Sequence, residues 1–149
     1  MLNAVSAPAA AFAAGCSAST IRALRTKGYI RGFGRRHGKG HVYTPSEVAR
    51  LAIVNILTRY GISLRRSFDL VAERERVIDG LLYLTTTDNA KRYTLTIAVD
   101  PDGRCVLANC DTAQTENTPD DLPVTIRINA TLVLRSAVER MNNFRTTPE

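Results

Sequence analysis

The chain has 149 residues, enough for one domain or two small ones, and its longest apolar runs fall short of the ~20 residues of a membrane span. Lys and Arg total 20 against 14 Asp and Glu, a formal net charge of +6. Residues 1–80 hold 13 basic and 5 acidic side chains, and residues 81–149 hold 7 and 9, which gives +8 and −2. This asymmetry excludes a uniformly charged surface and indicates that the front half meets a polyanion.

The alanine-rich stretch after Ser6 is predicted to form the first helix of the motif. Ser6 is a suitable N-cap, Pro8 falls in the first turn, and Phe12 is expected to anchor the helix in the core. The run A-A-A-F-A-A-G-C at 9–16 also resembles a lipoprotein cleavage box. A secretory signal needs a cationic start, and residues 1–14 contain no Lys or Arg. We therefore favour the helix.

A helix-turn-helix is predicted to continue from there. Gly15 permits a tight turn, and Ser17 can cap a second helix. Ala18, Ile21 and Leu24 recur at helical spacing and would face a core, which leaves Ser19, Arg22, Ala23 and Arg25 on the opposite face. Gly28 is placed to end this helix.

A basic, glycine-rich hairpin is expected next. Tyr29 and Ile30 would open a short strand, and glycines at 32, 34, 38 and 40 punctuate a segment that ends at Val42 and Tyr43. A helix with unpaired arginines followed by a cationic loop suits a DNA groove and its phosphate backbone. The candidate DNA-binding residues are Ser17, Ser19, Thr20, Arg22, Arg25, Lys27, Arg31, Arg35, Arg36, His37, Lys39, His41 and Tyr43.

Two further helices complete the predicted front domain, residues 1–80. Thr44 or Ser46 caps a helix with Glu47 in its first turn, which continues to about Tyr60 and is apolar over most of its circumference. Ser63 caps a second helix whose apolar stripe continues to Ile78. The charges on its other face are expected to be solvated, with Arg65 and Arg66 near enough to its start to touch DNA phosphates.

The back half, residues 81–149, is predicted to be a small α+β unit with a dimerising or regulatory role. The pattern changes to period two, with strands expected over 81–84, 93–99, 105–108 and 124–128 and a tight turn at 100–103. Asn129 caps a last helix. Its apolar residues Leu134, Val138, Met141 and Phe144 are the candidate dimer surface, since a small open sheet with one helix leaves apolar surface uncovered. The fold class is α+β.

The cysteines are Cys16, Cys105 and Cys110. Their odd number and irregular spacing differ from a secreted disulfide framework and favour a reducing, cytoplasmic compartment. We expect small buried side chains at these positions, and neither a metal site nor a cofactor.

Residues 13–68 resemble the winged-helix domain of the mercury-resistance regulator (MerR) family of bacterial transcription factors. The matching features are A-G-C-S-A-S-T-I-R at 14–22, G-Y-I at 28–30, Tyr43, E-V-A-R-L at 47–51, and G-I-S-L at 61–64. The resemblance implies a DNA-contacting role for Arg22 and makes Tyr43 the closing residue of the wing.

The chain also departs from this family pattern. Gly40 and His41 stand where the wing commonly has Tyr and Arg, and Ala23 stands where a tyrosine usually follows the arginine. Typical members continue into a long dimerising helix, whereas a β-rich unit is expected here after residue 80. The dimerisation mode and the inducer are therefore not implied.

The leading hypothesis is a sequence-specific transcriptional regulator of bacterial or phage origin. It would bind double-stranded DNA as a homodimer, with RNA polymerase or an unknown effector as a further partner and no membrane association. One alternative is an excisionase-like or architectural factor that bends DNA for a mobile element. Another is a ligand-sensing or protein-interaction module in residues 81–149. An enzyme is not expected, because both histidines lie in the hairpin and no catalytic constellation is visible.

Overall fold

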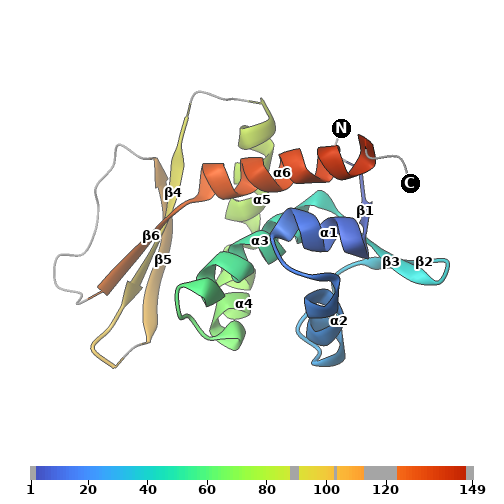
Figure 1. Cartoon of the computed structure of the whole chain (residues 1–149). Coiled ribbons are helices and arrows are strands. Elements are labelled where there is room, and N and C mark those ends of the chain that lie inside the picture. The colour runs from blue at the N-terminus through green and yellow to red at the C-terminus, as the bar shows by residue number, and fades with distance from the viewer. Residues whose placement is uncertain (1–2, 88–90, 103, 113–123, 147–149) are drawn as a thin grey trace.

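The computed structural model describes residues 3–87, 91–102, 104–112 and 124–146. Over these residues it has six helices and two three-stranded antiparallel sheets, which confirms the α+β class. In Figure 1 the helices occupy the middle of the molecule. One sheet stands on the left, and a hairpin projects on the right.

The chain opens with a two-residue strand, β1 (Val5–Ser6), and with helix α1 (Ala7–Ala14). The first helix is confirmed, with Ser6 at its N-cap and Pro8 in its first turn. The prediction that Phe12 anchors it is wrong, because this side chain is 51% exposed. Five alanines of α1 are buried instead, and they let it pack against α3 (Pro45–Arg59) and α6 (Ala130–Thr146). Small side chains allow this contact on faces from which a phenyl ring would be excluded.

Helix α2 (Ala18–Thr26) is confirmed, and the basic hairpin after it consists of β2 (Arg35–His37) and β3 (Gly40–Tyr43). The predicted strand at Tyr29 and Ile30 is wrong, because both residues lie in turns. Ile30 is fully buried there. A compact turn that buries this side chain takes the chain from α2 to the hairpin, and β1 pairs with the inner strand β3.

Helix α3 (Pro45–Arg59) is the central helix of the fold, as expected. Val48, Ile53 and Leu57 are fully buried, and Thr44 with Glu47 forms a capping box at its start. The side chain of each capping-box residue satisfies a backbone N–H of the other, which defines where the helix begins.

Two helices follow where one helix and a strand were predicted. The first, α4 (Leu64–Glu73), stops at Arg74, and α5 (Glu75–Thr87) continues through Gly80. The predicted strand at 81–84 is therefore wrong. The buried residues of α5 are Ile78, Leu81, Leu82 and Thr85. Their spacing of i, i+3, i+4 and i+7 is that of an amphipathic helix.

The second sheet has the order β5-β4-β6, with strands β4 (Tyr93–Val99), β5 (Cys105–Thr112) and β6 (Val124–Asn129). It confirms the three later strands. Asp100 organises the β4–β5 turn, because its Oδ1 accepts hydrogen bonds from the N–H groups of Asp102 and Arg104. Gly103 lies outside the described residues. The last helix, α6 (Ala130–Thr146), is capped by Asn129 as expected, since Asn129 Oδ1 accepts from Leu132 N–H at 2.9 Å.

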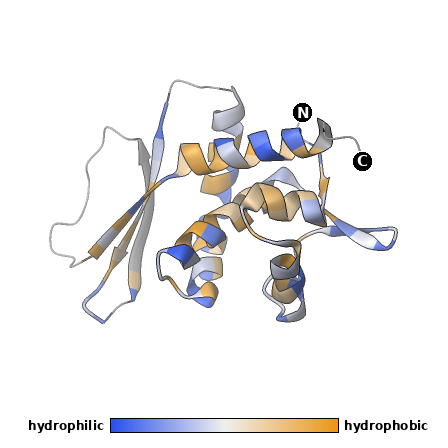
Figure 2. Ribbon diagram, viewed as in Figure 1, coloured by the Kyte–Doolittle hydropathy of each residue, from blue (hydrophilic) through white to orange (hydrophobic). Residues whose placement is uncertain are grey.

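The hydrophobic core spans both halves of the sequence. One buried cluster joins α3, α4 and α5 to β4, β6 and Leu134 of α6, and a second joins α1, α2 and α3 to Ala137 and Met141 of α6. Figure 2 shows α6 crossing α5 and running above α1, with its most hydrophobic segment at the end next to the sheet. Residue 80, where the front domain was expected to end, lies inside α5.

The expected dimer surface on α6 is corrected by this packing. Leu134 is fully buried and Met141 is 2% exposed within the single chain, and Val138 is half-buried against the first cluster. A side chain already enclosed by its own chain offers no area to a second copy. Phe144, at 41%, is the exposed member of the set.

Candidate nucleic-acid interface

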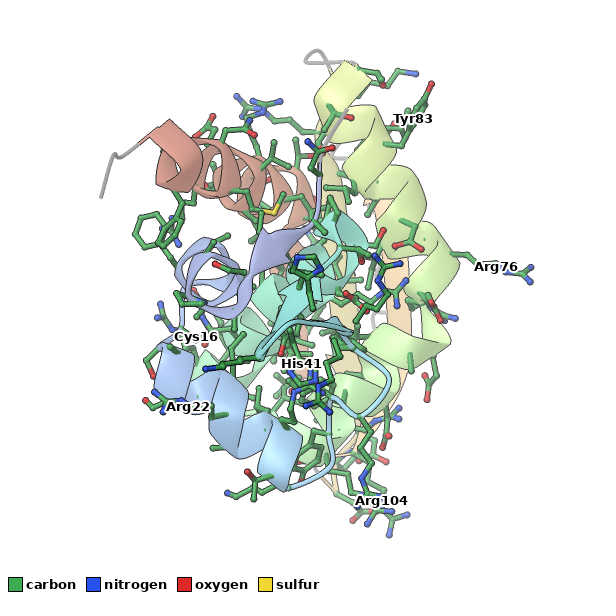
Figure 3. All side chains as sticks on the ribbon, turned by 90° about the vertical axis from the view of Figure 1, so that its right-hand side faces the viewer. Cys16, Arg22, His41, Arg76, Tyr83 and Arg104 are labelled. Atoms are coloured by element: carbon green, nitrogen blue, oxygen red, sulfur yellow. The ribbon has the colours of Figure 1, made fainter. Side chains whose placement is uncertain are left out.

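Helix α2 is positioned by its cap and by its buried face. Ser17 Oγ accepts a hydrogen bond from Thr20 N–H at 3.1 Å and lies 2.7 Å from Ser19 Oγ. Ile21 and Leu24 are buried, whereas Arg22 on the opposite face is exposed and extends from the helix in Figure 3. Helical spacing alone separates these two faces, so the sequence could predict them.

Arg25 does not lie with Arg22 on the exposed face. Its Nη2 donates to Phe33 O at 2.6 Å and to Tyr43 Oη at 2.9 Å, and its guanidinium lies 5.7 Å from the centre of the Tyr43 ring. Tyr43 is 1% exposed. The prediction that Tyr43 contacts DNA is therefore wrong, because its side chain is enclosed by its own chain. Arg25 is a positioning residue that joins α2 to the base of the hairpin.

Glu47 holds the other side of the hairpin base. Its carboxylate accepts from Gly34 N–H at 2.9 Å and from Thr44 N–H at 2.7 Å. Gly34 has φ +74°, a backbone conformation that other residues rarely adopt, and a Cβ there would lie 3.1 Å from the Tyr43 ring. Both the backbone conformation and the lack of space therefore favour glycine at this position. The sequence identified Glu47 as an acid in the first helical turn. It did not show that the same carboxylate reaches Gly34, 13 residues earlier.

The remaining cations surround α2 and the hairpin. The first 46 residues contain seven Lys and Arg and no Asp or Glu. The exposed basic side chains here are Arg22, Lys27, Arg31, Arg35, Arg36, His37 and Lys39, and His41 is half-buried. The ion pairs found among the described residues link Arg50 and Arg66 to acids and involve none of these side chains. His41 and Arg22 are both visible from the side that Figure 3 presents.

A cavity of about 560 Å³ separates the end of α2 from α4. Its walls include Tyr29 stacked on Phe68 with ring centres 5.3 Å apart, and Phe33 meets Phe68 edge-on. Lys27, which directly follows α2, and Arg65, in the first turn of α4, also line this cavity. The exposed side chain of Arg65 therefore lies near the end of α2. The sequence predicted a solvated charged face on this helix, with Arg65 close enough to the helix start to touch DNA phosphates.

The described part of the chain contains no group of three or more His, Cys, Asp or Glu side chains suited to a metal ion. None of its helices is both long enough and apolar enough to cross a bilayer. Cys16 and Cys105 are half-buried free thiols, where full burial was expected, and the side chain of Cys110 lies outside the description.

Residues 6–73 match the family model described as "MerR HTH family regulatory protein". The match starts at the N-cap of α1 and ends with the last residue of α4. This confirms the resemblance and identifies the segment as a MerR-type helix-turn-helix region. A search of curated proteins finds no match to the sequence.

Proposed function

We propose that the protein is a sequence-specific DNA-binding transcriptional regulator rather than an enzyme. The exposed face of α2 enters the major groove, with Arg22 at base edges and Ser19 and Thr20 beside it. The hairpin follows the phosphate backbone through Arg35, Arg36 and Lys39.

The observation that carries the proposal is the acid-free group of exposed cations on α2 and the hairpin. Surface charges of both signs are usually interspersed, and a stable fold gains nothing from six exposed Lys and Arg side chains placed close together. Phosphates give such a group a partner, because each contact releases condensed counterions. The MerR-type match over residues 6–73 points to the same partner.

The contacts of Arg25 and Glu47 support a rigid interface. They hold the hairpin base against α2 and α3, so that the two DNA-facing elements keep one relative geometry. Preorganisation of this kind reduces the entropy lost on binding.

The experiment is selection of double-stranded DNA from a random library by the full-length protein. Enrichment of one motif, followed by promoter-dependent expression changes that require the motif, supports the proposal. A matched selection with Arg22→Ala should lose the motif. Enrichment of no sequence by the wild-type protein overturns sequence-specific regulation.

The selected DNA also distinguishes a transcriptional regulator from the architectural alternative. Bending at several phased sites, without any change in transcription from a promoter that contains them, would favour an excisionase-like factor. A circular-permutation gel assay measures the bend angle, and a reporter assay measures the transcription.

We propose in addition that the regulator is a homodimer, since two-fold pairing doubles the footprint of a small DNA-binding unit. The contact must use surface other than Leu134 and Met141. The outer edges of β5 and β6 remain available, because both strands pair only with β4 among the described residues. Light scattering of the full-length protein tests this, and a monomer at high concentration contradicts it.

A further inference from the structure

Helices α1, α3 and α6 enclose a groove of about 480 Å³ that the proposed DNA interface does not use. One wall is a row along α6 formed by Leu132, Ser136 and Arg140, each four residues after the last, and Phe144 follows one turn beyond the groove, with its ring against Phe12. Residues at this spacing lie on one stripe of a helix. The short side chain of Ser136 leaves a hollow in the middle of this row, and Ala13 and Ala52 line the groove with small side chains.

Large apolar side chains are exposed around this groove. Leu132 is 59% exposed, Phe12 51% and Phe144 41%, and the rings of Phe12 and Phe144 have centres 6.0 Å apart. Apolar side chains scattered singly over a surface need no explanation, but exposed ones that line one groove are typical of a protein interaction site. Phe12 and Leu132 line this groove, and Phe144 packs on Phe12.

The charge of the groove has a single sign. Arg59 and Arg140 line it, and no Asp or Glu does. Arg59 Nη2 donates to Gly15 O at 3.1 Å, and among the described residues Arg140 has no hydrogen-bond or ion-pair partner. A second copy placed here across a two-fold axis would bring like charges together. DNA phosphates would match the arginines but offer nothing to the three apolar side chains.

We propose that this groove binds an acidic amphipathic helix of a partner protein. Leu132 and Phe144 are twelve residues apart on α6, about 18 Å at the rise of an α-helix, which matches a partner helix of roughly three turns. Its apolar face would contact Phe12, Leu132 and Phe144, and its flanking carboxylates would meet Arg59 and Arg140. In Figure 1 α6 crosses the upper part of the molecule and α2 lies at the lower right. A helix held along α6 therefore leaves the exposed face of α2 free for DNA.

The test uses the full-length protein and two fluorescein-labelled helical peptides of about 14 residues, with leucines at i, i+4, i+7 and i+11. One peptide has glutamates on the flanks of the leucine stripe, and the other has lysines there. Fluorescence anisotropy measures the affinity of each peptide. The variants are Leu132→Ser, Phe144→Ser and Arg140→Glu, all at exposed positions. Tyr83→Ser and Arg76→Glu are matched controls on the exposed surface of α5.

We expect the acidic peptide to bind and the lysine peptide to bind at least about tenfold more weakly. Arg140→Glu should reverse this preference, which a merely structural role for Arg140 would not do. The two serine variants should weaken both peptides, the controls should change neither, and circular dichroism should show unchanged folding.

Three results would overturn the proposal. The first is no binding of the acidic peptide at about 1 mM, or equal affinity for the two peptides. The second is a dimer that Leu132→Ser and Phe144→Ser convert into monomers, which would assign the groove to a second copy. The third is a loss of DNA affinity in Arg140→Glu as large as that in Arg22→Ala, which would assign the groove to DNA. Because DNA affinity is measured separately, failure of the groove proposal leaves the regulator proposal standing.

Discussion

Arg22 and Arg25 stand three residues apart on α2 and have different surroundings. Arg22 is exposed to solvent, whereas Arg25 is half-buried against Phe33 O and Tyr43 Oη. Sequence pattern put both on the polar face. The partners of Arg25 lie 8 and 18 residues further along the chain, and only folding brings them together.

Replacing Arg22 with Ala should cost about 1–3 kcal/mol of binding free energy on the cognate DNA site and less on random DNA, because a base-edge contact is lost. The midpoint of urea unfolding should stay unchanged, since the side chain is exposed. Competition binding with the two DNAs measures the difference. Equal losses of binding free energy on the cognate and the random DNA would mean that Arg22 contacts only phosphates.

Replacing Arg25 with Ala should lower the free energy of unfolding by about 1–3 kcal/mol, because it removes a charged donor from two partly buried acceptors. Tyr43→Phe removes the Oη partner alone and should cost about 0.5–1.5 kcal/mol. Urea unfolding measures both. If Arg25→Ala weakens DNA binding at full stability, Arg25 is an interface residue after all.

The thiol of Cys16 should react slowly in the folded protein. Burial raises its pKa above the ordinary value, an effect that the nearby Arg59 charge partly offsets. The raised pKa favours the neutral thiol in the folded state. The contribution of this thiol to the free energy of unfolding is therefore complete at pH values below the pKa of the unfolded thiol. It is lost as the pH rises through the pKa of the folded thiol. Alkylation by iodoacetamide, followed by site-resolved mass spectrometry across this pH range, should be slower in buffer than in urea. Equal rates would contradict the shift.

At the scale of elements, the hairpin depends on contacts at its base while its cations remain exposed. Alanine at Arg35, Arg36 and Lys39 should therefore weaken binding to all DNA sequences alike without unfolding the hairpin. Each lost phosphate contact should reduce the log–log slope of affinity against salt by about 0.9. Titrations at several salt concentrations measure the slope. The same slope in the triple variant would remove the hairpin from the interface.

For the whole molecule, α6 is the element that joins the two halves. Leu134→Ala should lower the free energy of unfolding by about 2–5 kcal/mol, because the side chain is fully buried where α6 meets the sheet and the front helices. Leu132→Ala, two residues earlier on the exposed side, should change it by less than about 0.5 kcal/mol. Similar values for the two variants would contradict the buried packing of α6.

Removal of residues 81–149 should destabilise the front half. The cut falls inside α5 and takes away Ala137 and Met141, which pack in the same cluster as α1 and α2. We expect fragment 1–80 to melt at a much lower temperature than the full chain and to bind DNA weakly. A fragment of full stability in thermal circular dichroism would support the boundary at residue 80.

The sequence by itself determined the features that depend on neighbouring residues. The caps at Ser17 and Asn129, the buried face of α2, the hairpin and the later strands all follow from local hydrogen bonding and short periodicity, and Thr44 was one of two cap candidates for α3. Tertiary structure alone decided whether the apolar run at 81–84 became strand or helix, since a short apolar run suits either. It also decided which side of α1 was buried and that α6 completes the core of the front helices. Those outcomes depend on contacts between residues far apart in the chain, which periodicity does not specify.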